Sequence, residues 1–198
     1  MEGLTHSTNL TNLPLSSSQI HLWLVAQQDL SNPSYNLHLT YHFQGEVDYD
    51  MLCKSVNLLF EKHYAVFSTF KQKNGEPYIE IVKRNADVEF INFSGTALND
   101  AREKVNSFLG ADLRKSFDLE KGPLFRLFLI KESDNSFFFH ATIHHLIFDG
   151  YSRKLFVKEL GEIYTGLLSG SPVAVEQPGL QSFDYAETGL TLLSEEEK

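Results

Sequence analysis

The fold is decided by the stretch from His140 to Gly150, which reads HATIHHLIFDG and joins an apolar run to a helical pattern. Side chains alternate along a strand, so one face of the strand carries Phe137, Phe139, Ala141 and Ile143. The other face carries His140, Thr142 and His144. If the strand persists by one residue, His145 joins the apolar face. The two adjacent histidines therefore lie in different environments, and we expect only one of them to face a given cavity.

Two further residues stand where this strand gives way to a helix. Asp149 lies directly before the helical pattern, where its carboxylate can cap the first amides or turn back to fix the turn that carries His145. Gly150 has no side chain, which leaves room for a ligand against a backbone N–H at the positive end of the helix dipole. The stretch therefore predicts a strand–turn–helix unit with a polar site at its turn.

Outward from this unit, helical and strand patterns are mixed along the chain. Hydrophobic spacing predicts a helix that begins near Ser16, one that Asp48 caps, and two over about 99–109 and 150–167. Residue alternation and apolar runs predict strands over 35–43, 65–71, 77–83, 88–92, 124–131 and 136–143, with Asn74-Gly75 as a hairpin turn. This mixture predicts an α/β fold, a two-layer sandwich with a mixed β-sheet and flanking helices.

Composition excludes several classes of protein. The chain has 198 residues, of which 42% are hydrophobic and 16 are Phe, so it can bury a sizeable core and is not disordered. A net charge of −9 repels phosphate backbones and anionic lipids, so we expect neither nucleic acid nor a membrane surface as a partner. Cys53 is the single cysteine, which excludes an internal disulfide. The polar N-terminus lacks a signal-peptide pattern, and no apolar run could span a bilayer, which favours a cytoplasmic protein.

Other interpretations of the histidine pair compete with a catalytic one. Two histidines at a strand end also suit polar groups that are satisfied beside a core, and this alternative stays open. A metal bound by His145 and Asp149 would need a third ligand, and none stands out at suitable spacing. A Ser-His-Asp triad would need a nucleophile elbow, and no Gly-x-Ser-x-Gly occurs in the chain. The remaining histidines are scattered, and we interpret each as surface or core filler.

The same stretch matches a known signature. Residues 144–150 read HHLIFDG, which resembles the HHxxxDG signature of condensation domains of nonribosomal peptide synthetases. Further stretches are similar to other motifs of that family and follow in the family's order: LPLS through NPSYN at 13–36, KH through STF at 62–70, FDLEKGPLFR at 117–126, GYS at 150–152 and DYA at 184–186. The resemblance covers about residues 13–190.

The sequence departs from the family at one motif. Tyr64 stands where the family has Glu, and Phe67 stands where it has an arginine that is thought to pair with the aspartate of the signature. Three supports for Asp149 remain in its place: Lys62, Arg126, or backbone amides alone.

The resemblance implies a chloramphenicol-acetyltransferase-like lobe. Family members have two such lobes with a tunnel between them, so this chain is identified as the N-terminal lobe. We expect a flexible leader over 1–12, the lobe over 13–170, and a linker over 171–198 towards a C-terminal lobe. The fragment alone is expected to be inactive because half of the tunnel wall is absent.

The resemblance also implies a reaction. A donor acyl group, held as a thioester on the phosphopantetheine arm of one carrier protein, is attacked by the amine of an aminoacyl group on the next carrier. His145 would accept the proton of the amine or position it, His144 would support it, Asp149 would hold the turn, and Gly150 would keep the tunnel open. The lobe itself binds no cofactor and no metal in this interpretation. Expected partners are the donor and acceptor carrier proteins, the C-terminal lobe and an adjacent adenylation domain.

The sequence leaves several functional alternatives open. The donor is either a fatty acyl group, as in a starter domain, or a peptidyl group. A non-catalytic carrier-docking lobe would keep the signature without turnover. A stand-alone acyltransferase that uses coenzyme A thioesters would need a basic patch for the adenosine phosphates, and this acidic chain offers none that is obvious.

Overall fold

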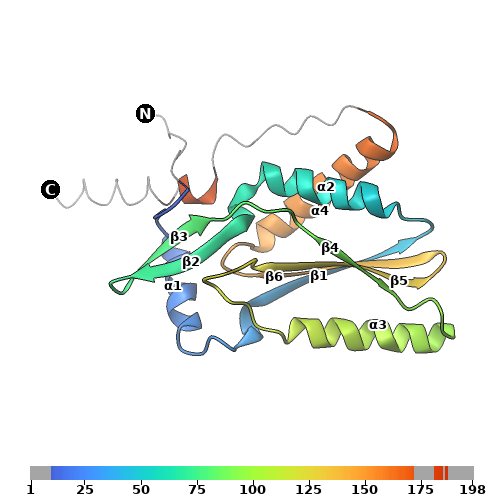
Figure 1. Ribbon diagram of the computed structural model, residues 1–198, viewed down its shortest axis with the longest axis horizontal. Coiled ribbons are helices and arrows are strands. Elements are labelled where there is room, and N and C mark those ends of the chain that lie inside the picture. The colour runs from blue at the N-terminus through green and yellow to red at the C-terminus, as the bar shows by residue number, and fades with distance from the viewer. Residues whose placement is uncertain (1–9, 172–180, 185, 187–198) are drawn as a thin grey trace.

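The computed structural model describes residues 10–171, 181–184 and 186 of the chain (Figure 1). The predicted helices and strands are present. The helices are α1 (Ser17–Ala26), α2 (Tyr49–Lys62), α3 (Leu98–Leu113) and α4 (Gly150–Leu168), with short 3-10 helices at Pro33–Tyr35 and Tyr64–Phe67. The strands are β1 (Asn36–Gln44), β2 (Ser68–Lys73), β3 (Glu76–Ile81), β4 (Val88–Asn92), β5 (Phe125–Ser133) and β6 (Ser136–His144).

The main sheet is mixed, as the sequence predicted. Its strand order is β1-β6-β5-β4, in which β4 runs parallel to β5 and the other neighbours are antiparallel. The strands β2 and β3 form a separate antiparallel hairpin. The β1–β6 register pairs Asn36 with His144, so β1 begins beside the histidine pair.

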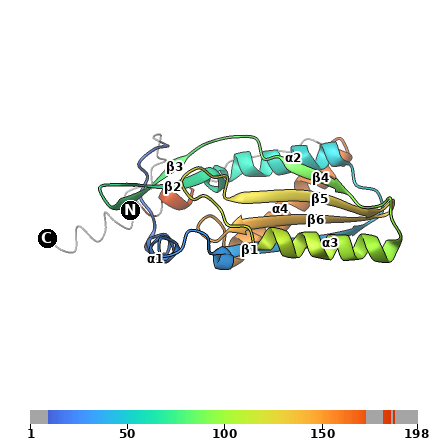
Figure 2. The ribbon, with the colours of Figure 1, turned by 60° about the horizontal axis from the view of Figure 1, so that its bottom comes forward.

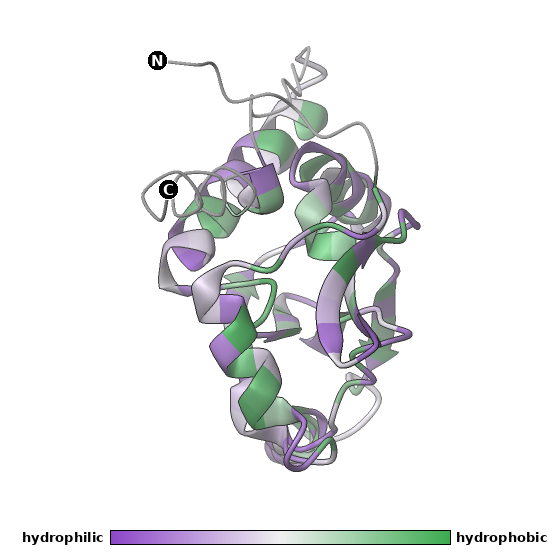
Figure 3. Cartoon of the chain, turned by 90° about the vertical axis from the view of Figure 1, so that its left-hand side faces the viewer, coloured by the Kyte–Doolittle hydropathy of each residue, from purple (hydrophilic) through white to green (hydrophobic). Residues whose placement is uncertain are grey.

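Helices cover both faces of the main sheet. Helices α2 and α4 pack on one face and α3 on the opposite face (Figures 1 and 2). Alternation along β6 follows these layers, because the side chains at 137, 139, 141 and 143 join the larger hydrophobic cluster. Val105, Phe128 and Ile130 form a second cluster with α3. Hydrophobic and hydrophilic residues alternate along the helices, as expected where only one side of each helix packs (Figure 3). The structure confirms the mixed α/β fold class.

The helix caps and the hairpin turn lie where the sequence predicted them. The Ser16 side chain accepts from the backbone N–H of Gln19 and caps α1, and Asp48 accepts from Met51 and caps α2. Asn74 and Gly75 have φ of 55° and 87°, the left-handed conformation that a tight hairpin turn requires.

Two predicted boundaries are wrong. The strand expected from residue 65 starts at Ser68, because Tyr64–Phe67 forms a 3-10 helix that buries Tyr64 and Phe67. The third helix was expected to end near 109 and continues to Leu113, which brings Asp112 under the sheet.

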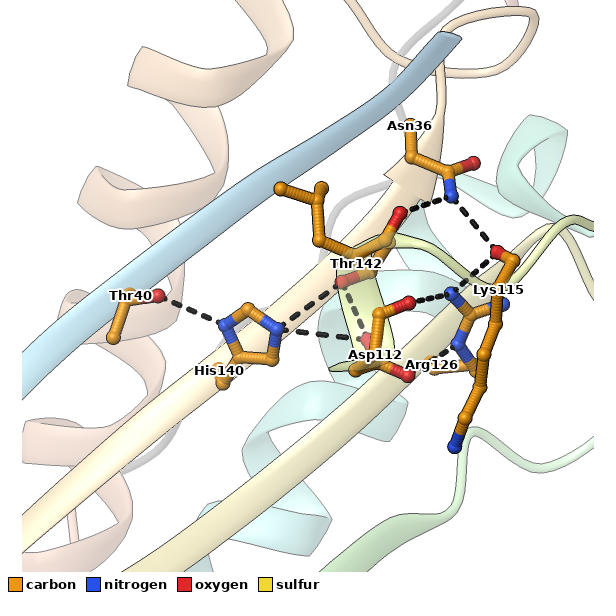
Figure 4. A network of polar contacts seen from close by, with 8 residues as sticks. Asn36, Thr40, Asp112, Lys115, Arg126, His140 and Thr142 are labelled. Carbon is orange, nitrogen blue, oxygen red and sulfur yellow. Dashed lines mark hydrogen bonds and ion pairs between the residues drawn. The ribbon is translucent and has the colours of Figure 1, made fainter. Parts of the chain in front are cut away.

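A buried polar network fastens the end of α3 to the sheet (Figure 4). Asp112 is fully buried; its Oδ1 accepts from Arg126 Nε at 2.7 Å and its Oδ2 accepts from Thr142 Oγ1 at 2.7 Å. The ring of His140 lies between Thr40 and Thr142, and its Nε2 is 3.6 Å from Asp112 Oδ2. Burial would raise the pKa of Asp112, but hydrogen bonds from His140, Thr142 and Arg126 lower it to about 2. These side chains therefore hold a carboxylate inside the fold.

The predicted domain boundaries remain predictions, because residues 1–9 and 172–180 lie outside the described part of the chain. Leu10 accepts a backbone hydrogen bond from Ile81 at 2.8 Å. Further along, Phe183 is buried and packs against Tyr64, with ring centroids 5.9 Å apart. Tyr185, of the DYA stretch at 184–186, is also outside the described residues. No helix within the described ranges has the length and apolarity that a membrane span requires.

Candidate functional site

The site is built on the turn that follows β6. The strand ends at His144, so His145 opens a turn and does not continue the alternation. The backbone N–H of His145 donates to the carbonyl of Tyr35 at 2.9 Å, and the N–H of Leu146 donates to His144 Nδ1 at 3.2 Å. Hydrogen bonds on both sides therefore hold the backbone of His145.

His144 is a structural residue of this turn. It is 5% exposed and lies near the rings of Tyr35 and Phe117, with centroids 6.4 and 6.1 Å away. Burial, with a smaller contribution from the charge of His145, lowers the pKa of His144 to about 4. Its Nδ1 accepts from Leu146, so the neutral ring carries its proton on Nε2. His144 therefore fits the alternative interpretation of the histidine pair, that of a polar group beside the core with its hydrogen bond satisfied.

His145 differs from its neighbour in one respect that matters for chemistry. The residue is half-buried, and its Nδ1 is a buried atom without a hydrogen-bond partner, the only such side-chain nitrogen or oxygen in the described ranges. A buried polar atom that lacks a partner costs about 1–3 kcal/mol, so its presence in a native fold calls for an explanation. A neutral imidazole with an unpaired nitrogen can accept a proton or a hydrogen bond.

The rings of three other histidines have polar partners. His140 contacts two threonine hydroxyls, His42 Nε2 lies 2.8 Å from Ser136 Oγ, and His63 Nε2 lies 2.5 Å from Glu159 Oε2. His63, which we interpreted from sequence as filler, thus has a specific polar contact with the carboxylate of Glu159. In the turn after β6, the imidazole of His145 thus has a ring nitrogen, Nδ1, that makes no hydrogen bond within the fold.

Asp149 caps α4. Its Oδ1 accepts from the backbone N–H and from the hydroxyl of Ser152, both at 2.7 Å. The backbone hydrogen bond from Ser152 is the main cause that lowers the pKa of Asp149. Of the two roles that the sequence allowed for this carboxylate, the structure shows the cap on the first turn.

Neither basic residue that was considered as a support for Asp149 reaches it. Lys62 Nζ pairs with Glu159 Oε1 at 2.7 Å, and Arg126 pairs with Asp112 across the other face of the sheet. Phe67, in the place of the family's arginine, packs its ring 6.0 Å from those of Phe60 and Phe125. The sequence left backbone amides as the third possible support for Asp149. The contacts with Ser152 match it, because they come from a backbone N–H and, in addition, from one hydroxyl.

This cap gives a stability prediction. Asp149→Ala is expected to lower the free energy of unfolding by about 1 kcal/mol, whereas Asp149→Asn should cost much less because asparagine caps helices about as well. Urea unfolding of the two variants beside wild type measures the difference. Equal losses in both variants would show that the negative charge, and not the capping oxygen, stabilises the turn.

Gly150 borders open space. A Cβ built on Gly150 would meet no atom within 4 Å, and the residue is exposed. The first turn of α4 thus presents backbone without a side chain next to Asp149.

An apolar pocket of about 260 Å³ lies beside the same turn. It is enclosed by α2, α4, the 3-10 helix at 64–67 and residues 181–182, and its walls include Leu59, Phe60, Val66, Ile147, Phe148, Leu155 and Phe156. His63 and Ser152 supply polar atoms at its wall. His145 itself does not line this pocket, although Ile147 and Phe148 follow it in the turn.

A cluster of polar side chains that the sequence did not reveal borders this pocket. Glu159, from α4, binds both Lys62 and His63 at the end of α2. Burial would raise the pKa of Glu159, but hydrogen bonds from Lys62 and His63 lower it. The partners lie about a hundred positions apart in the chain, so no local spacing could have indicated the cluster. Among the described residues, no group of three or more His, Cys, Asp or Glu side chains could hold a metal ion.

Comparison with known proteins places this geometry in a family. The family model of the condensation domain matches residues 9–196. Malpinin synthetase of Mortierella alpina is 31% identical over 185 residues, which are 93% of this chain and 2% of that protein. Surfactin synthase subunit 2 of Bacillus subtilis (strain 168) is 33% identical over 153 residues, which are 77% of this chain and 4% of that protein. The chain therefore spans only a few per cent of the length of these relatives.

Solved structures show the same fold. The starter condensation domain of the rhizomide synthetase RzmA superposes with a TM-score of 0.82 at 19% identity, over 91% of this chain and 45% of that one. The first condensation domain of the CDA synthetase gives a TM-score of 0.75 at 21% identity, over 84% of this chain and 43% of that one. This chain thus corresponds to less than half of each solved domain. From its motifs, its fold and the family match over nearly its whole length, the chain belongs to the condensation-domain family of nonribosomal peptide synthetases.

Proposed function

We propose that this chain is the N-terminal lobe of a domain that forms an amide bond between two carrier-bound substrates, and that His145 is its central residue. The amine of the acceptor aminoacyl group attacks the carbonyl of the donor thioester. The C–N bond forms, the C–S bond breaks, the nitrogen loses a proton, and the phosphopantetheine sulfur leaves as a thiolate that is then protonated. The observation that carries the proposal is the imidazole of His145, whose Nδ1 has no partner at the turn of the signature.

This reaction requires the protein to position the amine against the thioester carbonyl and to provide a proton acceptor. An α-amine has a pKa near 8 and is partly neutral at cellular pH, so the barrier lies in holding it against the carbonyl and in removing a proton as the bond forms. His145 accepts the proton or the hydrogen bond of the amine. His144 remains neutral, because burial lowers its pKa to about 4, and it fixes the turn through Leu146.

Asp149 and Gly150 have supporting roles in this proposal. Asp149 fixes the start of α4, which follows the turn of His145, through its contacts with Ser152. Gly150 leaves open space where a side chain would stand, and its N–H lies at the positive end of α4. A developing oxyanion would be stabilised by such a backbone donor.

We further propose a starter-type domain with a fatty acyl donor. A mutant of the RzmA starter domain has been solved in complex with C8-CoA, and that fold is shared at a TM-score of 0.77. The pocket beside the turn, at about 260 Å³, is apolar and smaller than the roughly 300–1,000 Å³ of common ligand sites, which suits a short alkyl chain. The competing donor is a peptidyl group, whose amides would meet few hydrogen-bond partners in this mostly apolar lining.

The partners follow from the same reaction. Donor and acceptor carrier proteins would deliver the substrates on phosphopantetheine arms, and a C-terminal lobe would complete the tunnel. An adjacent adenylation domain would load the acceptor carrier, and the complex would work in the cytoplasm. The RzmA and CDA chains, of which this chain covers 45% and 43%, support the need for a second lobe.

The function is tested in the complete synthetase module with both carriers loaded. We expect mass spectrometry to detect an acyl-aminoacyl product on the acceptor carrier, formed faster from a fatty acyl donor than from a peptidyl donor. A faster reaction with the peptidyl donor would contradict the starter assignment alone. A module that binds both carriers and forms no product from either donor would favour the non-catalytic docking lobe, for which the loss of the arginine at Phe67 is the supporting observation.

Gly150 provides a test of the space in front of α4. Gly150→Ala is expected to keep or raise the free energy of unfolding, because the added methyl group meets no atom and alanine favours the helix. The same methyl group would intrude on the donor thioester, so the rate of product formation should fall by roughly 10-fold or more. Thermal unfolding and the module assay measure the two effects. Gly161→Ala is the matched control, because this glycine of α4 also has no neighbour within 4 Å of its Cβ position and lies outside the turn. Equal rates of product formation in the two variants would show that the substrate does not occupy the space in front of Gly150.

A further inference from the structure

A side chain of the first helix is hydrogen-bonded to the turn of His145. Gln19 lies at the third position of α1, and its Nε2 donates to the carbonyl of Leu146 at 3.0 Å. The contact joins residues that are 127 positions apart. Both views of the ribbon place α1 beside the β2–β3 hairpin, at the end of the molecule where the chain leaves β6 (Figures 1 and 2).

Gln19 is held for this contact at its other end. Its Oε1 accepts from the backbone N–H of Ser16 at 3.0 Å, while Ser16 Oγ accepts from the N–H of Gln19 at 3.3 Å. The two residues form a capping box, in which each side chain accepts from the backbone N–H of the other residue. A capping box needs only an acceptor at Gln19, which glutamate would supply equally well. The amide NH₂ is therefore the part of Gln19 that helix capping does not explain.

The carbonyl that Gln19 holds belongs to the residue after His145. Leu146 is fixed at its N–H by His144 Nδ1 and at its carbonyl by Gln19, and the N–H of His145 is fixed by Tyr35. Each of the three contacts comes from a different part of the chain. Without the Gln19 contact, the peptide that follows Leu146 loses its hydrogen bond to α1, and the turn is held from its strand side only.

We propose that Gln19 is a positioning residue for His145, which sets the place of its imidazole by anchoring the turn to α1. The inference rests on the proposed function of His145. Misplacement of a catalytic group by about 1 Å can cost roughly 100-fold in rate, so loss of the anchor lowers turnover although Gln19 touches no substrate.

Two variants and one control separate this role from helix stability. Gln19→Glu keeps the acceptor of the capping box and places an acceptor where Leu146 needs a donor. Gln19→Met removes the donor without adding a charge. Ser16→Ala removes the cap of the same box and leaves the Gln19–Leu146 contact in place. In the complete module, we expect kcat to fall roughly 10- to 100-fold in both Gln19 variants, with KM for each loaded carrier unchanged. Ser16→Ala should lower the thermal midpoint and leave kcat within threefold of wild type.

A spectroscopic readout makes the test independent of turnover. In protein labelled with ¹⁵N-histidine, the imidazole resonances of His145 should shift in Gln19→Glu and Gln19→Met and stay in place in Ser16→Ala. Wild-type kcat and unshifted His145 resonances in the Gln19 variants would overturn the inference. So would an equal loss of kcat in Ser16→Ala, because helix stability would then explain the effect. His145→Ala in the same assay reports on the proposed function itself: if that variant keeps wild-type turnover, the role of His145 fails, whatever Gln19 does.

Discussion

Replacement of His145 by alanine in the complete module is expected to lower the rate of amide formation by roughly 10²- to 10⁴-fold, the usual contribution of a positioned acid or base. The ring is half-buried, its Nδ1 has no partner, and its backbone is held by Tyr35 and by the contact between Leu146 and His144. The substitution thus removes the group that accepts from the amine and leaves the hydrogen bonds of the turn in place. Single-turnover measurement of product on the acceptor carrier records the loss.

Folding and carrier binding provide the controls for this prediction. Because Nδ1 of the His145 ring has no hydrogen-bond partner to lose, the thermal midpoint of His145→Ala should stay close to that of wild type. The affinity for both loaded carriers should also be retained. His144→Ala is the contrasting variant: it removes a buried ring and the acceptor of Leu146, so it should lower the thermal midpoint clearly. A product rate in His145→Ala within about threefold of wild type, which is less than 1 kcal/mol in activation free energy, would contradict the catalytic assignment.

Replacement of Asp112 by alanine is expected to lower the free energy of unfolding by about 3 kcal/mol, because it leaves the half-buried Arg126 without its carboxylate and the buried Thr142 without its acceptor. Arg126, Thr142 and His140 all point at this fully buried carboxylate (Figure 4). The substitution would leave the guanidinium of Arg126 without its carboxylate and release the end of α3. Denaturant unfolding measures the loss, and Asp118→Ala, at a partly exposed carboxylate that pairs with Lys121, is the control. A loss below 1 kcal/mol in Asp112→Ala would contradict the network's role.

The same carboxylate makes stability depend on pH. The pKa of Asp112 falls from 3.8 to about 2 in the folded state, so the folded protein binds this proton less readily than the unfolded chain. The contribution, on the order of 2 kcal/mol, is full above pH 4 and is lost as the pH falls towards 2. Asp112→Asn should remove this part of the pH dependence, whereas wild type should lose stability over that range. An identical acid profile in the two proteins would contradict the assignment.

Much of the local structure could be predicted from sequence. Asp48 and the apolar spacing after it determine α2, and Asn74-Gly75 marks the hairpin, because caps and left-handed turns depend on neighbouring residues. The strand–turn–helix unit around His144 and Asp149 was predicted for the same reason. Boundaries failed where tertiary burial decided them: Phe67 is drawn into the core with its 3-10 helix, and Asp112 extends α3 to meet Arg126.

The polar networks could not be predicted because they join residues far apart in the chain. Arg126 seemed available to Asp149 from sequence, but it lies on β5 across from Asp112 and is fully engaged there. Lys62 is likewise bound to Glu159. The different environments of the two histidine rings could not be assigned from sequence either. The strand ends at His144, and the ring of His144 accepts a hydrogen bond from Leu146.

The most direct measurement of the central claim is a structure of the complete domain with a donor thioester analogue and an acceptor amine analogue bound. The ring of His145 should lie within about 2.6–3.2 Å of the acceptor nitrogen, on the side of the turn that carries Gly150. A ring that packs against the lobe, with its nitrogens beyond reach of that amine even through one water molecule, would contradict the role of His145 in amide formation.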